Sequence, residues 1–424
     1  MFSGYAVNQT RYTFPETKGL TVRGACQILL WLALASSSLV LIEPAPYEGL
    51  IAGLLVLLPL AGLISFNQRL SLYLLCWIVI GAAGLLASTQ SGDMSTSIKH
   101  TVISVFLSLG SVLIAATIRS NPSRHAQIIM SGLFFAMIIA AILGTLGYFR
   151  LIPGAYELLT KFDRAKGTFK DPNVYGAFLV PAIVYSLHCI ATARAGRALI
   201  QAGVMGVVCI GLLVSYSRGA WFHAGLSMLS YAGVAFIASN TDRFRLKLFV
   251  LGAFGLAALA LGFVALLQID AVAELLKHRA SLSMGYDSGP QGRFGGQLKA
   301  LGMISELPLG LGALEFSRSY HSEDVHNVYL SMFLNCGWIG GFLYLGLVIA
   351  TIWIALSHSF RKGELQGLMV VMFASFTGLA AEGAIIDTDH WRHFYILMGI
   401  IWGIAAANDK YHDGFTSRQI RHAV

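Results

Sequence analysis

Hydrophobic residues in this chain gather in long continuous runs that are separated by short polar segments. The runs do not alternate apolar and polar positions with period two, as membrane-spanning strands would. Most are close to the roughly 20 residues that a helix needs to cross a bilayer. The pattern therefore predicts an all-α polytopic membrane bundle of twelve helices. The expected spans are 24–43, 47–66, 70–88, 101–118, 127–148, 173–193, 198–216, 219–239, 248–268, 335–357, 365–384 and 393–408.

The composition agrees with a membrane protein. Of the 424 residues, 56% are hydrophobic and only 12% are charged, whereas a soluble globular protein carries about 25% charged residues. Backbone polar groups in lipid must be satisfied internally, which leaves helical bundles or closed barrels. The formal net charge is +8. We interpret it through its distribution about the membrane, and we expect no nucleic-acid partner.

The distribution of basic residues predicts the orientation. Ten Lys and Arg lie in the five short loops on the side of the termini, and three lie in the four short loops on the other side. Basic residues of short loops favour the cytoplasm. We therefore expect a multi-pass protein of a bacterial inner membrane, with both termini cytoplasmic and the functional residues on the periplasmic face.

Two outer loops are longer than is needed to join helices, near 150–172 and 268–324, and long ordered loops are usually functional. In the second loop, AVAELLKHRASL (271–282) and GGQLKALGMISEL (295–307) have helical apolar spacing. We expect one integral membrane domain over 1–424, with a periplasmic cap of short helices inserted at 269–325.

Candidate chemistry is concentrated in the outer segments. A two-residue turn brings Arg218 to the membrane surface at the start of a helix, where a guanidinium and unpaired N–H groups can bind an anion. His326, with a side chain that titrates near neutrality, and Asn327 precede a long apolar run. The alternatives are arginines that reach lipid phosphates and a histidine that caps its helix. The stretches concerned are FDRAKGTFKDPNVYG (162–176), SYSRGAWF (215–222), QGRFGGQLKALGMISELPLGLGALEF (291–316), SEDVHNVYL (322–330) and DTDHWRHF (387–394).

A metal site is not expected. The DTD and HWRH patterns of residues 387–393 could supply ligands, but no other outer loop offers an obvious acidic partner for a hard cation. We interpret Asp389 as a residue that orients an arginine or a histidine. The five cysteines show no CxxC spacing, which indicates neither a disulfide framework nor a zinc ribbon.

Four of these motifs, in this order, resemble the O-antigen ligase/polymerase superfamily: GTFKDPN, SYSRGAWF, RFGGQLKALGMISELPLGLG and HNVYLSMFLNCGWIGG. His326, Asn327, Leu330 and Gly337 fit the pattern His-Asn-x-x-Leu-x6-Gly that in the ligases follows a large periplasmic loop. The resemblance covers roughly residues 160–400. The five earlier spans match in hydropathy only.

The resemblance implies a GT-C-like membrane glycosyltransferase. Such a ligase transfers O-antigen from undecaprenyl diphosphate to lipid A–core in lipopolysaccharide assembly, with inversion and without a metal or other cofactor. By motif, His326 corresponds to the essential histidine, and Arg218 and Arg293 to functional arginines.

To these residues we add Arg164 and Lys166 as further ligands of the donor diphosphate, and Asn327 and Asp389 as orienting residues. The expected partners are the lipid-linked donor, the lipid A–core acceptor and membrane lipids. An O-antigen polymerase, a protein O-oligosaccharyltransferase and a lipid-linked sugar transporter are the alternatives.

Overall fold

The computed structural model describes residues 21–268, 289–290 and 292–422, and these are helical apart from one short hairpin and the connecting loops. All twelve expected ranges contain a helix. The long elements are α1 (Val22–Ala35), α2 (Pro46–Leu60), α3 (Gln68–Ser88), α4 (Met94–Ser120), α5 (Pro122–Tyr148), α7 (Pro172–Thr192), α8 (Ala195–Val214), α9 (Arg218–Ala238), α10 (Asp242–Leu267), α13 (Val328–Ser359), α14 (Gln366–Glu382) and α15 (Arg392–His422).

Within the described part of the chain, seven helices are long and apolar enough to cross a membrane: α3, α4, α5, α7, α8, α9 and α13. The helices α1, α2 and α14 are apolar but shorter, with 14, 15 and 17 residues. The protein is therefore an integral, multi-pass membrane protein with a helical fold. That all twelve helices cross the bilayer remains a prediction.

The first helix is shorter than its apolar run. The run continues to Leu41, but α1 ends at Ala35. The Ser36 and Ser37 hydroxyls donate to the carbonyls of Ala33 and Leu34, at 3.1 and 2.7 Å, which satisfies acceptors at the helix end. The chain then leaves the helix, and the Val40 N–H donates to the Thr168 carbonyl at 3.0 Å. Tertiary contacts with a distant loop thus replace the last helical turn.

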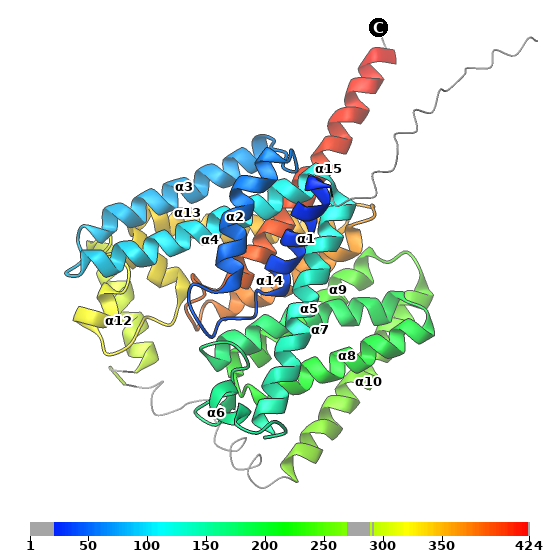
Figure 1. Ribbon diagram of the computed structural model, residues 1–424, viewed down its shortest axis with the longest axis horizontal. Coiled ribbons are helices and arrows are strands. Elements are labelled where there is room, and N and C mark those ends of the chain that lie inside the picture. Colours follow the sequence, from blue (N-terminus) through cyan, green and yellow to red (C-terminus); the bar gives the residue numbers. More distant parts are fainter. Residues whose placement is uncertain (1–20, 269–288, 291, 423–424) are drawn as a thin grey trace, which may run out of the picture.

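Close packing of small residues sets the distance between α4 and α15. A Cβ atom on Gly399 would lie 2.5 Å from the Ser111 carbonyl oxygen, and one on Gly403 would lie 2.9 Å from the Cα of Ala115. Small residues four positions apart let two membrane helices approach closely. Figure 1 shows α3, α4 and α13 in one part of the bundle and α7 to α10 in another.

The helix α13 is interrupted at Gly337, which has φ 64° and ψ −171°. A Cβ at this position would lie 2.5 Å from the Pro308 carbonyl oxygen, so only glycine fits. The break is bridged by the segment after α12, where Trp338 N–H donates to Pro308 O at 2.9 Å and Leu311 N–H to Leu334 O at 2.6 Å. The glycine of the His-Asn-x-x-Leu-x6-Gly motif therefore anchors the loop that precedes His326.

Both loops that were expected to be long and outer contain local structure in the residues described. The first holds α6 (Ala155–Leu159) and the hairpin of β1 (Thr160–Lys161) and β2 (Arg164–Ala165). The second holds α12 (Arg293–Glu306), as the sequence predicts, and the π-helix η1 (Phe316–Tyr320). α12 packs on α13 (Figure 1). The helix expected at 271–282 lies outside the described residues.

Candidate active site

One cavity of about 500 Å³ brings together four of the predicted site residues. Arg164, Arg218, Arg293 and His326 all line it, although they are spread over 163 positions of the sequence. We call this cavity the outer pocket. Its remaining lining is Phe162, Asp171, Asn173, Tyr216, Ser217, Gly219, Phe294, Glu323, Glu382, Ile385 and Ile386.

Arg218 is the first residue of α9, as its sequence context predicts. The N-cap Ser217 has extended backbone angles, and its hydroxyl accepts from the Ala220 N–H at 3.3 Å. Tyr216, with φ 47°, completes the reversal from α8. The guanidinium therefore sits beside the positive end of a 21-residue helix, a combination that favours a bound anion.

Arg164 connects the hairpin to the turn before Arg218. Its Nε donates to the Ser215 carbonyl and one terminal nitrogen to Asn173 Oδ1, both at 2.8 Å. The residue is buried, with 7% of its surface exposed. A guanidinium has five N–H donors, so these two bonds fix its orientation within the outer pocket. Arg164 thus also supports the turn that presents Arg218.

Arg293 begins α12 after the N-cap Gly292. One turn later in the same helix, Gln297 Nε2 donates to the His326 carbonyl at 3.1 Å. The cap helix therefore holds the backbone of His326 and brings the positive charge of Arg293 to the same wall of the pocket.

His326 is held in an uncommon backbone conformation, with φ 53°. Its N–H donates to Asp387 Oδ2 at 2.9 Å. In the side chain, Nε2 lies 3.4 Å from Glu323 Oε2 and Nδ1 lies 4.0 Å from Asp387 Oδ2. Burial lowers the pKa of His326 and the charge of Arg293 lowers it further, while Glu323 and Asp324 act in the opposite direction. The imidazole is therefore neutral at neutral pH and able to accept a proton.

Asp387 is a site residue that the sequence reasoning missed. Burial and the neighbouring Asp389 raise the pKa of Asp387 to about 7. Its carboxylate accepts from the Ser331 hydroxyl and from the His326 N–H. The DTD motif was the available signal, but spacing alone does not show which of its two acids faces the histidine.

Three predicted residues do not line the outer pocket. Lys166 follows the hairpin, where its N–H donates to Leu159 O at 2.9 Å; burial and then the charge of Lys161 lower its pKa. Asn327 is the N-cap of α13, and its side chain accepts from the N–H groups of Tyr329 and Leu330 at 3.1 and 3.2 Å. It therefore starts the helix directly after His326. Asp389 lies in a different cluster.

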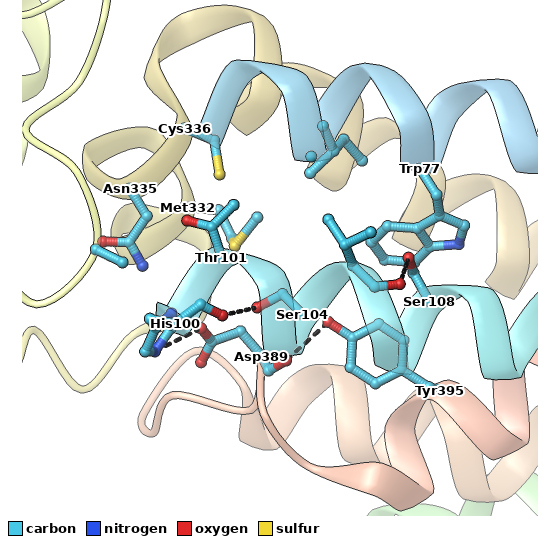
Figure 2. A pocket seen from close by; sticks show the side chains of 14 residues that line it. Trp77, His100, Thr101, Ser104, Ser108, Met332, Asn335, Cys336, Asp389 and Tyr395 are labelled. Atoms are coloured by element: carbon cyan, nitrogen blue, oxygen red, sulfur yellow. Dashed lines mark hydrogen bonds and ion pairs between the residues drawn. The ribbon is translucent and has the colours of Figure 1, made fainter. Parts of the chain in front are cut away.

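Figure 2 shows Asp389 in a small cavity of about 30 Å³ together with His100, Ser104 and Tyr395. Its Oδ2 lies 3.8 Å from His100 Nε2, and its backbone carbonyl accepts from the Tyr395 hydroxyl at 2.7 Å. Asp389 thus lies beside His100 and not beside His326, and its orienting role stays a prediction.

His100, Asp389 and His390 could together hold a metal, because their ligand atoms lie within 4.8 Å of one another. The imidazole rings of His100 and His390 are stacked, however, with 3.7 Å between their centroids and 22° between their planes. The lone pairs of nearly parallel rings run side by side, so one ring must rotate before both could bind the same ion. His393, the other histidine of HWRH, packs against the rings of Phe178 and Trp391.

A buried pair at the wall of the outer pocket, to which Glu382 contributes, was also missed. His223 Nδ1 lies 3.0 Å from Glu382 Oε2, and both side chains are fully buried. His223 Nε2 lies 3.0 Å from the Ser375 carbonyl, which only accepts, so Nε2 donates. One proton is then shared between Nδ1 and Glu382. The pair joins α9 to α14 close to Arg218, and only the fold could reveal it.

The fold and the site together define a multi-pass helical membrane protein with a pocket in which three arginines and one histidine converge. Such a pocket suits a ligand that carries phosphate and exchangeable hydroxyl groups.

Residues 202–345 match the family model described as O-Antigen ligase, which confirms the resemblance over this part of the chain. The match extends from α8 into α13 and includes Arg218, Arg293 and His326. A comparison with curated proteins finds no match.

Proposed function

We propose that this protein is a GT-C-like, inverting O-antigen ligase. It would transfer a polysaccharide from undecaprenyl diphosphate to a sugar hydroxyl of lipid A–core, without a metal. The observation that carries the proposal is the convergence of Arg164, Arg218, Arg293 and His326 in one pocket at the start of α9 and α13. The family match over residues 202–345 supports the same substrate class.

In the proposed reaction, the acceptor oxygen forms a bond to the anomeric carbon while the bond from that carbon to the diphosphate oxygen breaks. The bonding pair leaves with the lipid diphosphate, and Arg218 and Arg293 stabilise the charge that develops there. His326 takes the proton of the attacking hydroxyl, for which its lowered pKa keeps it unprotonated. Attack from the face opposite to the leaving group inverts the anomeric centre.

The acidic residues of the outer pocket fit a ligand with hydroxyl groups. Glu323 and Asp171 line the same cavity as the arginines. Carboxylates repel a diphosphate but accept hydrogen bonds from sugars. We propose that the arginines bind the diphosphate and that the acids contact the sugars.

The reaction is tested with purified full-length protein, undecaprenyl-diphosphate-linked polysaccharide and lipid A–core, with EDTA present. A polysaccharide ladder attached to lipid A–core supports the ligase. Chains that lengthen on undecaprenyl diphosphate without using lipid A–core identify a polymerase. If neither product forms, a serine- or threonine-containing protein is the next acceptor to test. Transport of the lipid-linked sugar would be tested after that.

A further inference from the structure

Another cavity, of about 530 Å³, lies where α13 ends and α14 begins. The outer pocket lies at the other ends of these two helices, because His326 precedes α13 and Glu382 ends α14. We call this second cavity the turn cavity. It shares no residue with the outer pocket, so binding in the turn cavity does not depend on the proposed reaction.

The turn cavity has a positively charged rim. Arg361 and Lys362 belong to the exposed α13–α14 turn and line it. Its only acidic lining residue in the described chain, Glu364, already accepts from the Ser123 hydroxyl. No ion pair of Arg361 or Lys362 occurs within the described residues. Their charges are therefore available to an anion.

One helix N-terminus adds donors to this rim. α14 begins at Gln366, which lines the turn cavity, whereas α5 begins there at Pro122, which has no N–H, and is capped by the Asn121 side chain. The N-cap of α14 is Leu365, which makes no side-chain capping bond. First-turn N–H groups without a cap favour a bound anion.

His358 supplies a hydrogen-bond acceptor beside the turn cavity. The residue lines the turn cavity and is 2% exposed. Its Nδ1 lies 2.9 Å from the Ile354 carbonyl, which only accepts, so Nδ1 carries a proton. Nε2 has no hydrogen-bond partner in the described part of the protein. In the neutral ring this nitrogen is an acceptor. Because Nε2 is itself buried, a ligand hydroxyl would satisfy it after displacing the side chains that cover it.

The remaining lining makes the cavity amphiphilic. Leu365, Met369 and Ile404 supply apolar walls beside the basic rim. A soluble phosphate would leave these walls unused, whereas the first carbons of acyl chains would cover them. We propose that the turn cavity binds an anionic phospholipid whose headgroup carries a hydroxyl, such as phosphatidylglycerol.

The charge requirement is tested by native mass spectrometry of the full-length protein titrated with phosphatidylglycerol. The double variant Arg361→Gln/Lys362→Gln should bind about thirtyfold more weakly, from the typical contribution of two basic residues beside an anionic headgroup. The matched control is Arg194→Gln/Arg197→Gln, at the N-cap and in the first turn of α8. These residues do not line the turn cavity, and the variant should bind as the wild type does. Equal affinity of the double variant and the wild type would overturn the proposal.

The hydroxyl requirement is tested with phosphatidylmethanol, which has the same single charge and no headgroup hydroxyl. The wild type should prefer phosphatidylglycerol about fivefold, the typical effect of one hydrogen bond, and His358→Leu should remove that preference. A wild type without any preference would contradict the role of His358. Free glycerol phosphate should not compete; effective competition would identify a site for soluble phosphate esters instead.

Discussion

Replacing Glu323 with glutamine tests whether His326 is the titrating base. Glu323 Oε2 lies 3.4 Å from His326 Nε2, and its charge favours the protonated ring. At this distance two unit charges interact by about 1.2 kcal/mol in bulk water and by about 5 kcal/mol at an effective dielectric constant of 20. The side chains are 26% and 46% exposed, which places the pair near the lower value. Glu323→Gln should therefore lower the pKa of His326 by about one unit.

The assay is the pH dependence of kcat/KM for transfer to lipid A–core. Activity of a base-dependent reaction rises as pH rises through the pKa of the base, so the acid limb should move about one unit to lower pH. At pH values below the limb, the lower pKa leaves more of the histidine deprotonated, but the deprotonated histidine is a weaker base. The first effect is larger, so the variant should be about threefold faster there. On the plateau it should be about threefold slower. Glu157→Gln, at an exposed position of α6, is the matched control and should leave the profile unchanged.

An unmoved acid limb would refute this reasoning. An acid limb that stays in place in Glu323→Gln would mean that His326 is not the group whose titration controls the rate. Asp387 is the competing candidate, because burial and Asp389 raise its pKa to about 7 and its deprotonation would also produce an acid limb. If the limb belongs to Asp387, Asp387→Asn should remove it and Glu323→Gln should not move it.

Four further predictions concern the arginine, the histidine, the buried pair and the metal. Arg218→Lys should lower the transfer rate at least tenfold, because an ammonium cannot make the paired contacts of a guanidinium with a diphosphate; near-normal kinetics would contradict this role. His326→Ala should insert and fold normally, as judged by size-exclusion chromatography, yet lose at least a hundredfold in rate; aggregation would favour a structural role. His223→Leu should be destabilised by about 3–5 kcal/mol, the usual effect of removing one partner of a buried pair, and melt several degrees lower. Glu382→Gln should lose less, since its amide can still donate to the imidazole, and equal losses would refute a shared proton. EDTA should leave the transfer rate unchanged, and inhibition that Mg²⁺ reverses would instead indicate an ion at the DTD motif.

The local sequence was sufficient to predict where α9 and α12 begin beside the site. Ser217, directly before Arg218, is the N-cap of α9, and α12 begins at Arg293, two residues before the range that its apolar spacing indicates. These features depend on neighbours within one turn of helix, which a sequence displays directly. The start of α13 was predicted less well, because its apolar run was expected from 335 whereas the helix begins at Val328 after the N-cap Asn327. The length of α1 could not be predicted in this way, because Thr168, far along the chain, binds the backbone of Val40.

The tertiary structure decides which acidic residue contacts which histidine. Asp387 and Asp389 are two positions apart, yet one contacts His326 and the other contacts His100. The loop before α15 presents its side chains to different neighbours, and the identity of those neighbours is set by helix packing. For the same reason, the buried pair of His223 and Glu382 could not be inferred from two apolar runs.

By itself, the sequence determined that the protein is a multi-pass helical bundle with basic residues and a histidine near the ends of its helices. Lipid requires long apolar helices, and polar residues must therefore collect where the helices end. The convergence of Arg164, Arg218, Arg293 and His326 in one pocket was decided only by the tertiary structure. Their relative positions depend on the packing of α9, α12 and α13 and of the hairpin, and on hydrogen bonds such as those from Gln297 and to Asp387. Such long-range contacts leave no periodic signal in a single sequence.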